Sequence, residues 1–212
     1  MARKAKIDNA ILKYRQKKKD LKRGKKSLPL RKYYLIVSEG EKTEPNYFES
    51  YKKLLPKHLI ELEILGTGES TLKLLNTAIK ESEKREYDEV WIVFDKDSFP
   101  KYKFDNTIFS AKAKKIKCAY SNEAFEIWYL LHFVYYNTGI SREEYKKKLS
   151  ELLGFEYKKN DPDMYEYLKS KQKIAIENAK RLYLNYDHKS PAKENPSTTV
   201  YKLIIELNEY IK

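Results

Sequence analysis

Glu89-Val-Trp-Ile-Val-Phe-Asp-Lys-Asp-Ser-Phe-Pro100 is the stretch that decides the fold, because an apolar run of β-branched and aromatic residues ends there in two aspartates separated by one lysine. The run predicts a buried strand that delivers carboxylates to its end. Side chains of a strand alternate between its two faces, so Asp95 and Asp97 should point the same way and Lys96 the other way. Pro100 ends further strand pairing.

Two carboxylates held this close repel each other unless a cation lies between them. Mg²⁺ and Mn²⁺ take oxygen ligands from carboxylates and keep several waters, so the pair predicts a divalent-metal site. The alternative is an ordinary polar turn in which Asp95 or Asp97 caps the next helix. The stretch alone leaves both interpretations open.

Strand and helix patterns alternate on both sides of this stretch. This alternation predicts an α/β fold, a Rossmann-like parallel sheet built from right-handed crossovers with helices on both faces. Strands are expected at 33–37, 58–65, 90–94 and 116–120, and helices from Thr43 and at 70–85 and 104–115. A buried helix at 125–133 and helices at 141–153, 164–184 and 198–211 should follow.

Ligands of such folds bind beyond the carboxyl ends of the strands, so Glu39, Asp95 and Asp97 are expected at one edge of the sheet. Three carboxylates there suit a metal site for phosphoryl chemistry, in which a cation polarises a phosphodiester and generates or orients hydroxide. Glu41 and Glu44 could add ligands or a general base. For Glu44, more than for Glu41, we favour the alternative of a solvated acid in the first turn of a helix.

Other polar residues are candidates with weaker support. Glu126 and His132 lie in the apolar segment 125–133, so each needs a partner. Glu126 is expected as a further acid at the site. His132 could contact phosphate or carry a proton, although satisfaction by the backbone or by Asn122 is favoured for it.

The remaining candidates would contact substrate. Gly66-Thr-Gly-Glu-Ser-Thr71 lacks the lysine and first glycine of a P-loop, so ATP hydrolysis there is rejected and a tight turn is favoured over a phosphate contact at Ser70. Asn195-Pro-Ser-Thr-Thr199 is typical first of a turn and helix cap, and second of phosphate or RNA contact through Ser197 and Thr198. Lys42, Lys96 and Asn122 complete the expected substrate contacts.

Positive charge is concentrated at the N-terminus. Residues 1–32 hold 14 of the 44 Lys and Arg but only two of the 31 Asp and Glu, so the remaining 30 basic and 29 acidic residues nearly balance. This arm, which could hold a helix at 9–23, would attract phosphate backbones without reading sequence. A solubilising leader is the alternative.

We expect three regions: the basic arm 1–32, an α/β domain 33–132 and a helical subdomain 133–212. The single Cys118 cannot form an internal disulfide, and neither a secretory signal pattern nor a long apolar run is present. A cytoplasmic protein with no membrane partner is therefore expected, with its oligomeric state open.

Five ordered motifs resemble those of one family. Glu39-Gly40 and Asp95-Lys-Asp97, each after a strand, are similar to the Glu and DxD motifs of the Toprim fold. Across nearly the whole chain the motifs resemble the RloB-like family: Ser38-Glu-Gly-Glu-Lys-Thr-Glu-Pro-Asn-Tyr-Phe48, Gly66-Thr-Gly68, Val93-Phe-Asp-Lys-Asp97, Ser121-Asn122 with Phe125-Glu126, Trp128 and His132, and Asn195-Pro-Ser-Thr-Thr199. Glu123-Ala124 departs from the Pro-Cys associated with that place.

The resemblance implies a Toprim-like sheet with Glu39, Asp95 and Asp97 as metal ligands of a nuclease. It also implies a role in abortive phage resistance of the AbiL type, beside an AAA or ABC-type ATPase, with RNA such as tRNA or DNA as substrate. The alternative is a nucleic-acid-binding or sensor subunit that keeps the Toprim core only as a scaffold.

Overall fold

The computed structural model describes residues 30–96 and 100–211, and residues 31–212 form one compact unit. The expected basic arm, apart from residues 30–32, and its helix at 9–23 lie outside the described residues. Asp97 lies outside them as well. Within the described residues, no helix is both long and apolar enough to cross a bilayer.

Five strands form one sheet in the order β2-β1-β3-β4-β5. The first four are parallel, and β5 runs antiparallel to β4. Ser38 at the end of β1 lies beside Val93, and Asp95 at the end of β3 lies beside Ser121. The expected parallel sheet is confirmed, and the strands are β1 Lys32–Ser38, β2 Ile60–Gly66, β3 Glu89–Asp95, β4 Lys117–Asn122 and β5 Ser197–Thr198.

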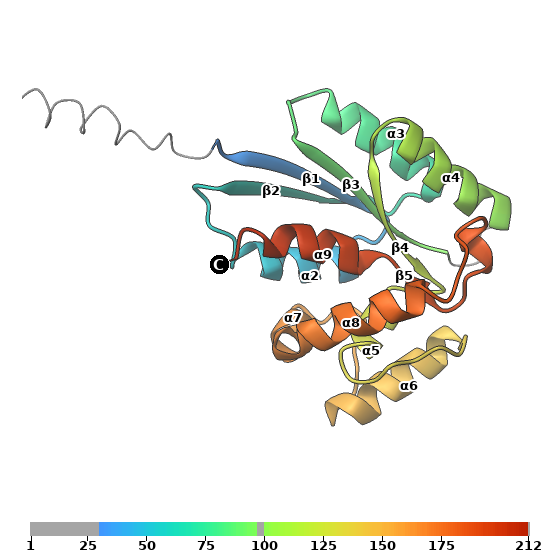
Figure 1. Ribbon diagram of the computed structural model, residues 1–212. Helices are drawn as coiled ribbons and strands as arrows, with labels where there is room; N and C mark the ends of the chain where they lie inside the picture. The colour runs from blue at the N-terminus through green and yellow to red at the C-terminus, as the bar shows by residue number, and fades with distance from the viewer. Residues whose placement is uncertain (1–29, 97–99, 212) are drawn as a thin grey trace, which may run out of the picture. The chain divides into compact units, whose positions relative to one another are not determined.

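Helices cover both faces of the sheet (Figure 1). One face packs on α3 (Thr71–Ser82) and α4 (Lys101–Ala113), and the other face packs on α2 (Thr43–Lys52) and α9 (Val200–Asn208). Strand alternation explains this division, since Leu35 and Val37 of β1 join the first core while Tyr34 and Ile36 join the second. Asp95 follows Trp91 and Val93 by the same alternation, and therefore faces the α2 side.

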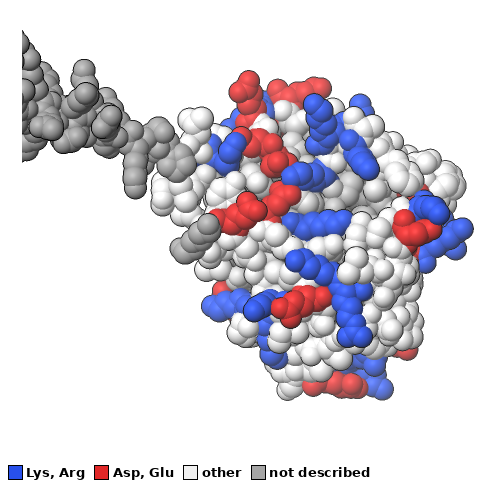
Figure 2. Space-filling view, viewed as in Figure 1, with Lys and Arg blue, Asp and Glu red and all other residues white. Residues whose placement is uncertain are grey.

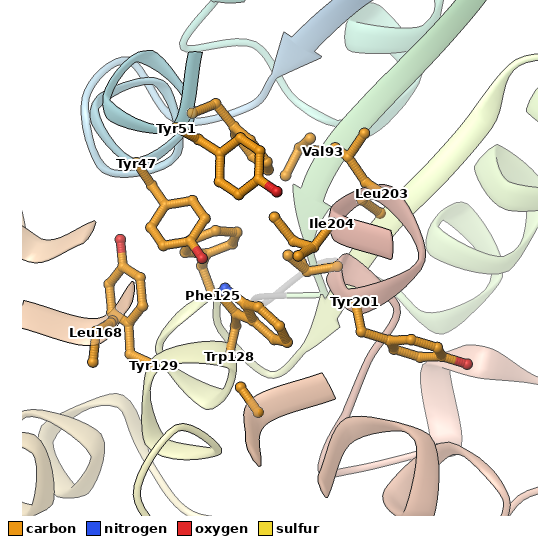
Figure 3. Close-up of a cluster of buried hydrophobic side chains, with 14 of the residues drawn as sticks. Tyr47, Tyr51, Val93, Phe125, Trp128, Tyr129, Leu168, Tyr201, Leu203 and Ile204 are labelled. Carbon is orange, nitrogen blue, oxygen red and sulfur yellow. The ribbon is translucent and has the colours of Figure 1, made fainter. Parts of the chain in front are cut away.

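The second core is rich in aromatic side chains. Tyr47 of α2 makes edge contacts with Phe125 at 5.9 Å and with Tyr165 at 5.3 Å between ring centroids. Figure 3 shows Tyr47 and Tyr51 of α2 with Trp128 and Tyr129 of α5 (Glu126–Leu130) in the cluster that also holds Leu203 and Ile204 of α9. Many of the chain's tyrosines therefore serve as core residues, and they anchor α5 against the sheet.

The C-terminal segment is less uniformly helical than expected. The helix expected at 164–184 is divided into α7 (Met164–Leu168), a 3₁₀ turn (Lys169–Lys171) and α8 (Gln172–Tyr183). The helix expected at 198–211 begins only at Val200, because Ser197 and Thr198 form β5. Residues on both sides of the expected boundary at 132/133 thus share one sheet and one core.

Helix α6 (Arg142–Leu153) shows how local sequence fixes an element. Ser141 accepts a hydrogen bond from the Glu144 backbone N–H, and the Glu144 carboxylate accepts one from the Ser141 N–H, a capping box. The helix ends at Gly154, whose φ of 80° is the left-handed conformation that glycine adopts without strain. The chain then turns back toward α2.

Candidate functional site: a buried acidic cluster

Asp95 lies at the centre of a group of four carboxylates. It is 9 % exposed at the end of β3, and its backbone N–H donates to Glu39 Oε2 at 3.3 Å. Its carboxylate accepts a hydrogen bond from the Phe125 backbone, while its Oδ1 atom has no hydrogen-bond partner within the part of the chain that the structure describes. Burial raises the pKa of Asp95 well above its usual value, and Glu44, Glu126 and Glu39 raise it further.

Glu44 belongs to this cluster, and the expectation that it is a solvated helix-turn acid is wrong. It is only 5 % exposed, because α2 packs its first turn against the end of β3 and the loop after α6. Burial raises the pKa of Glu44, Glu126 adds to the rise, and Lys159 and Arg142 oppose it. Buried acids whose pKa is shifted by neighbouring charges are frequent at functional sites, so Glu44 becomes a candidate residue of this site.

Gly40 makes room for Glu44. A Cβ atom at residue 40 would lie 2.0 Å from Glu44 Oε2, far inside van der Waals contact. The glycine after Glu39 therefore allows the Glu44 carboxylate to fold against the loop that follows β1.

Glu126 is the fourth acid of the cluster. It is the first residue of α5 and is 6 % exposed. The Tyr157 hydroxyl donates to Glu126 Oε1 at 3.1 Å, and burial with this carboxylate raises the pKa of Tyr157. The donor to Glu126 thus comes from the loop between α6 and α7.

A pocket of about 460 Å³ opens over Asp95 and is lined by side chains of both signs. Glu39, Glu41 and Glu44 contribute the acids. Its basic lining residues are Lys42, Arg142 and Lys159. Anionic oxygens of a ligand could bind these cations while the acids hold a cation.

The loop between α6 and α7 is fastened to α2, which explains how Lys159 reaches the pocket. Thr43 Oγ1 donates to the Lys159 carbonyl at 3.0 Å, and Asn46 Nδ2 donates to the Asn160 carbonyl at 3.1 Å. Local sequence patterns predict only a connection between the expected helices 141–153 and 164–184, so Lys159 and Tyr157 were not expected at the site. Arg142, at the start of α6, was not expected there either. The only local signal of these three residues is positive charge or aromaticity, which is common throughout this chain.

The donor set suits a hard divalent cation, since four carboxylates lie together and Asp95 Oδ1 and Glu44 Oε2 both lack a hydrogen-bond partner among the described side chains. Over residues 30–96 and 100–211, however, no three His, Cys, Asp or Glu side chains are arranged to hold a metal ion. The expected ligand Asp97 falls in the gap between these ranges. Its role as a ligand stays a prediction.

Four of the expected substrate contacts lie inside the protein. Ser197 and Thr198 are fully buried in β5, where Thr198 Oγ1 is 3.1 Å from Ser121 Oγ. Asn122 is 2 % exposed, and its Nδ2 donates to the Pro191 carbonyl at 3.2 Å. His132 has no exposed surface, and its Nδ1 lies 2.8 Å from the Trp128 carbonyl. The structure therefore does not bring these side chains to the pocket. The Trp128 carbonyl is a backbone partner of the kind that the sequence favours for His132.

The other expected residues lie at the rim. Lys42 and Glu41 are exposed and line the pocket. The Thr67 and Gly68 amides donate to the carbonyls of Ser38 and Glu39, so this tight turn braces β1. Half-buried Ser70 precedes α3, and half-buried Lys96 follows Asp95; neither is among the lining residues.

The burial of His132 predicts a loss of stability in acid. Burial lowers its pKa to about 4 from 6.5, so between these values the unfolded chain binds the extra proton. This contribution is complete above pH 6.5 and is lost as the pH falls toward 4, amounting to about 2 kcal/mol at pH 5. Urea unfolding gives the free energy of unfolding at pH 7 and at pH 5. The decrease between these pH values should be smaller by about 2 kcal/mol in His132→Phe than in the wild type. An equal difference in both proteins would contradict it.

The comparisons with known proteins give one family. The family model described as RloB-like protein matches residues 34–207. No curated protein and no solved structure matches the chain.

Proposed function

The chain belongs to the RloB-like family, and on this premise we propose that it is a Mg²⁺- or Mn²⁺-dependent nuclease that hydrolyses phosphodiester bonds in RNA, such as tRNA, or in DNA. The observation that carries the proposal is that Glu39 and Glu44 line one pocket with Asp95 at the end of β3, where the Asp95 N–H donates to Glu39 Oε2. Glu126 adds a fourth negative charge that acts on Asp95. Buried acids that raise one another's pKa are a frequent mark of functional sites.

The acids divide into two proposed tasks. Glu39, Asp95 and Asp97 would hold the cation, with Glu44 and Glu126 completing the negative cluster around Asp95. A bound divalent cation supplies Lewis acidity toward a phosphodiester oxygen and lowers the pKa of water. Glu41, exposed on the pocket wall, is the candidate general base.

The basic residues of the pocket would position the substrate. Lys42, Arg142 and Lys159 line the same cavity as the acids, so a phosphate group that enters it meets both cations and carboxylates. Arginine and lysine bind phosphate oxygens through charge-assisted hydrogen bonds. Lys159 therefore serves as a phosphate-binding residue, and the loop that holds it serves as a wall of the site.

The activity is tested with the purified full chain and labelled tRNA, single-stranded RNA and duplex DNA. We expect cleavage of at least one substrate with Mg²⁺ or Mn²⁺ and none with EDTA. A second set of reactions includes the ATPase encoded beside the protein, if there is one. Absence of cleavage under all of these conditions would refute the nuclease.

We further propose, from the family resemblance, that the nuclease is the effector of an abortive phage defence and works with an AAA or ABC-type ATPase. Phage plating on cells that carry the wild type or the Asp95→Asn variant tests this role. Equal plating efficiency on both would contradict it.

The second candidate is a nucleic-acid-binding or sensor subunit without catalysis. One observation favours it: among the described residues, no three His, Cys, Asp or Glu side chains are arranged to hold a metal ion. Deleting residues 1–29 separates the two functions. A pure binder should lose most of its salt-sensitive affinity, whereas a nuclease should keep metal-dependent turnover on short substrates.

Gly40→Ala should disturb the site without unfolding the protein. The new Cβ meets only the end of the flexible Glu44 side chain, 2.0 Å away, so the carboxylate must move while the backbone can stay. We expect metal affinity and cleavage to fall about 10- to 100-fold, as for other residues that orient a ligand set, with little change in the melting temperature. Gly139→Ala, outside the pocket, is the control. Unchanged metal affinity in Gly40→Ala would show that the position of Glu44 does not matter.

A further inference from the structure

A second cavity, of about 600 Å³, lies beside β4 and has no lining residue in common with the acidic pocket. Helices α4, α8 and α9 contribute its walls. β5 pairs with β4 at Ser121 and Asn122, while Lys117, Cys118 and Tyr120 of β4 line the cavity. The shortness of β5 thus leaves the first part of β4 as a cavity wall.

Positive charge dominates the walls. Four lysines line the cavity, against one lining carboxylate, Glu206. Figure 2 shows basic side chains across the middle of the face on which α4, α8 and α9 lie, with acidic groups among them. The four are Lys112, Lys115, Lys117 and Lys202.

Two of these lysines are held in place by neighbours. Lys117 Nζ lies 2.9 Å from Glu89 Oε2 and 2.8 Å from Glu206 Oε1. Lys202 Nζ lies 3.8 Å from the centroid of the Tyr183 ring, a cation–π contact. Lys112 and Lys115, at the end of α4, are exposed. The cavity therefore combines fixed and adaptable cations.

Aromatic rings line the cavity beside the lysines. The imidazole of His188 stacks on the Tyr183 ring at 3.6 Å between centroids and 14° between planes. His188 Nδ1 lies 3.1 Å from Glu194 Oε2, and Glu194 is only 3 % exposed, so a buried carboxylate fixes the orientation of the imidazole. Phe109 of α4, which also lines the cavity, is 47 % exposed.

We propose that this cavity binds a nucleotide. The base would stack on Phe109 or on the face of the His188 imidazole that points away from Tyr183, and the phosphate would contact the lysines. Base stacking on aromatic side chains together with backbone phosphates on lysines is how proteins bind nucleotides of single strands. An inorganic anion would leave the aromatic walls unused, and an apolar ligand would offer no negative charge to Lys112, Lys115 and Lys202. The site is independent of catalysis at Asp95.

Two sources share this chemistry, a free nucleotide and the unpaired end of an RNA. Both are tested with the full chain in EDTA, at low and at physiological salt, using ATP in calorimetry and a short fluorescein-labelled single-stranded RNA in anisotropy. Tighter binding of ATP assigns the cavity to free nucleotides, and tighter binding of the RNA assigns it to a strand end.

Two cavity variants and two matched controls decide the site. Lys202→Glu and Phe109→Ala should each lower the affinity for the tighter-binding probe at least about tenfold. Lys180→Glu on α8 and Tyr102→Ala on α4 replace exposed residues outside the cavity and should bind like the wild type. Asp95→Asn should keep the binding, so failure of the nuclease proposal leaves this result intact. No binding of either probe up to about 1 mM, or unchanged binding in both cavity variants, would overturn the proposal.

Discussion

Asp95→Asn is expected to lose metal-dependent cleavage by at least about a thousandfold, because it removes the charge at the centre of the proposed cation site while keeping the size of the side chain. Cleavage of labelled RNA or DNA under single-turnover conditions measures the loss. Asp163→Asn, an exposed aspartate before α7 with no side-chain capping bond, is the matched control and should cleave at the wild-type rate. Wild-type cleavage by Asp95→Asn would refute the site.

The same substitution should stabilise the protein in EDTA. Asp95 is buried beside three other carboxylates that raise its pKa, so its charge opposes folding when no cation compensates it. We expect a gain of about 1 kcal/mol or more and a melting temperature higher by a few degrees. Added Mg²⁺ or Mn²⁺ should stabilise the wild type by mass action and leave the variant nearly unchanged. Equal stabilisation of both proteins by the metal would place the cation elsewhere.

Leu203→Ala is expected to destabilise the whole compact unit by about 2–5 kcal/mol. Leu203 of α9 has no exposed surface and packs in the core shared with α2 and α5 (Figure 3). For a unit of this size the melting temperature should fall by roughly 2–4 °C for each kcal/mol. The loss should affect a single transition, because helices before and after residue 132 bury the same side chains.

Leu184→Ala is the control for this measurement. Leu184 is 80 % exposed at the end of α8, so its truncation removes little buried surface and should change stability by less than about 0.5 kcal/mol. A separate, lower-melting transition in Leu203→Ala would show that the segment 133–212 unfolds as a subdomain of its own.

Much of the sheet follows from local patterns. The apolar run before Asp95 predicts β3 because a parallel strand buried on both faces needs apolar side chains at nearly every position. Alternation with helices then requires crossovers, and parallel crossovers bring the ends of β1 and β3 to one edge. Strand pattern and crossover geometry therefore predict that Glu39 and Asp95 meet, as the hydrogen bond from the Asp95 N–H to Glu39 Oε2 shows.

Local patterns failed where burial depends on distant segments. Glu44 lies where the sequence predicts a solvated acid in the first turn of a helix, yet its side chain is buried. Lys159 of the loop between α6 and α7 and Glu126 of α5 are close enough to shift its pKa. The Thr43–Lys159 bond that fastens this loop spans 116 positions in the chain. For Ser197 and Thr198 the sequence favours a turn and helix cap, with phosphate contact second, yet pairing with β4 buries both side chains.

The sequence by itself therefore determined the α/β fold and the strand end that delivers Asp95, since strand alternation and apolar periodicity act over a few neighbouring residues. Only the tertiary structure decided that Glu44 joins the acidic cluster and that Lys159 and Arg142 line the same pocket. The physical reason is that the burial and pKa of a charged group depend on the segments that pack around it. Periodicity indicates only the face of its own strand or helix on which a residue lies.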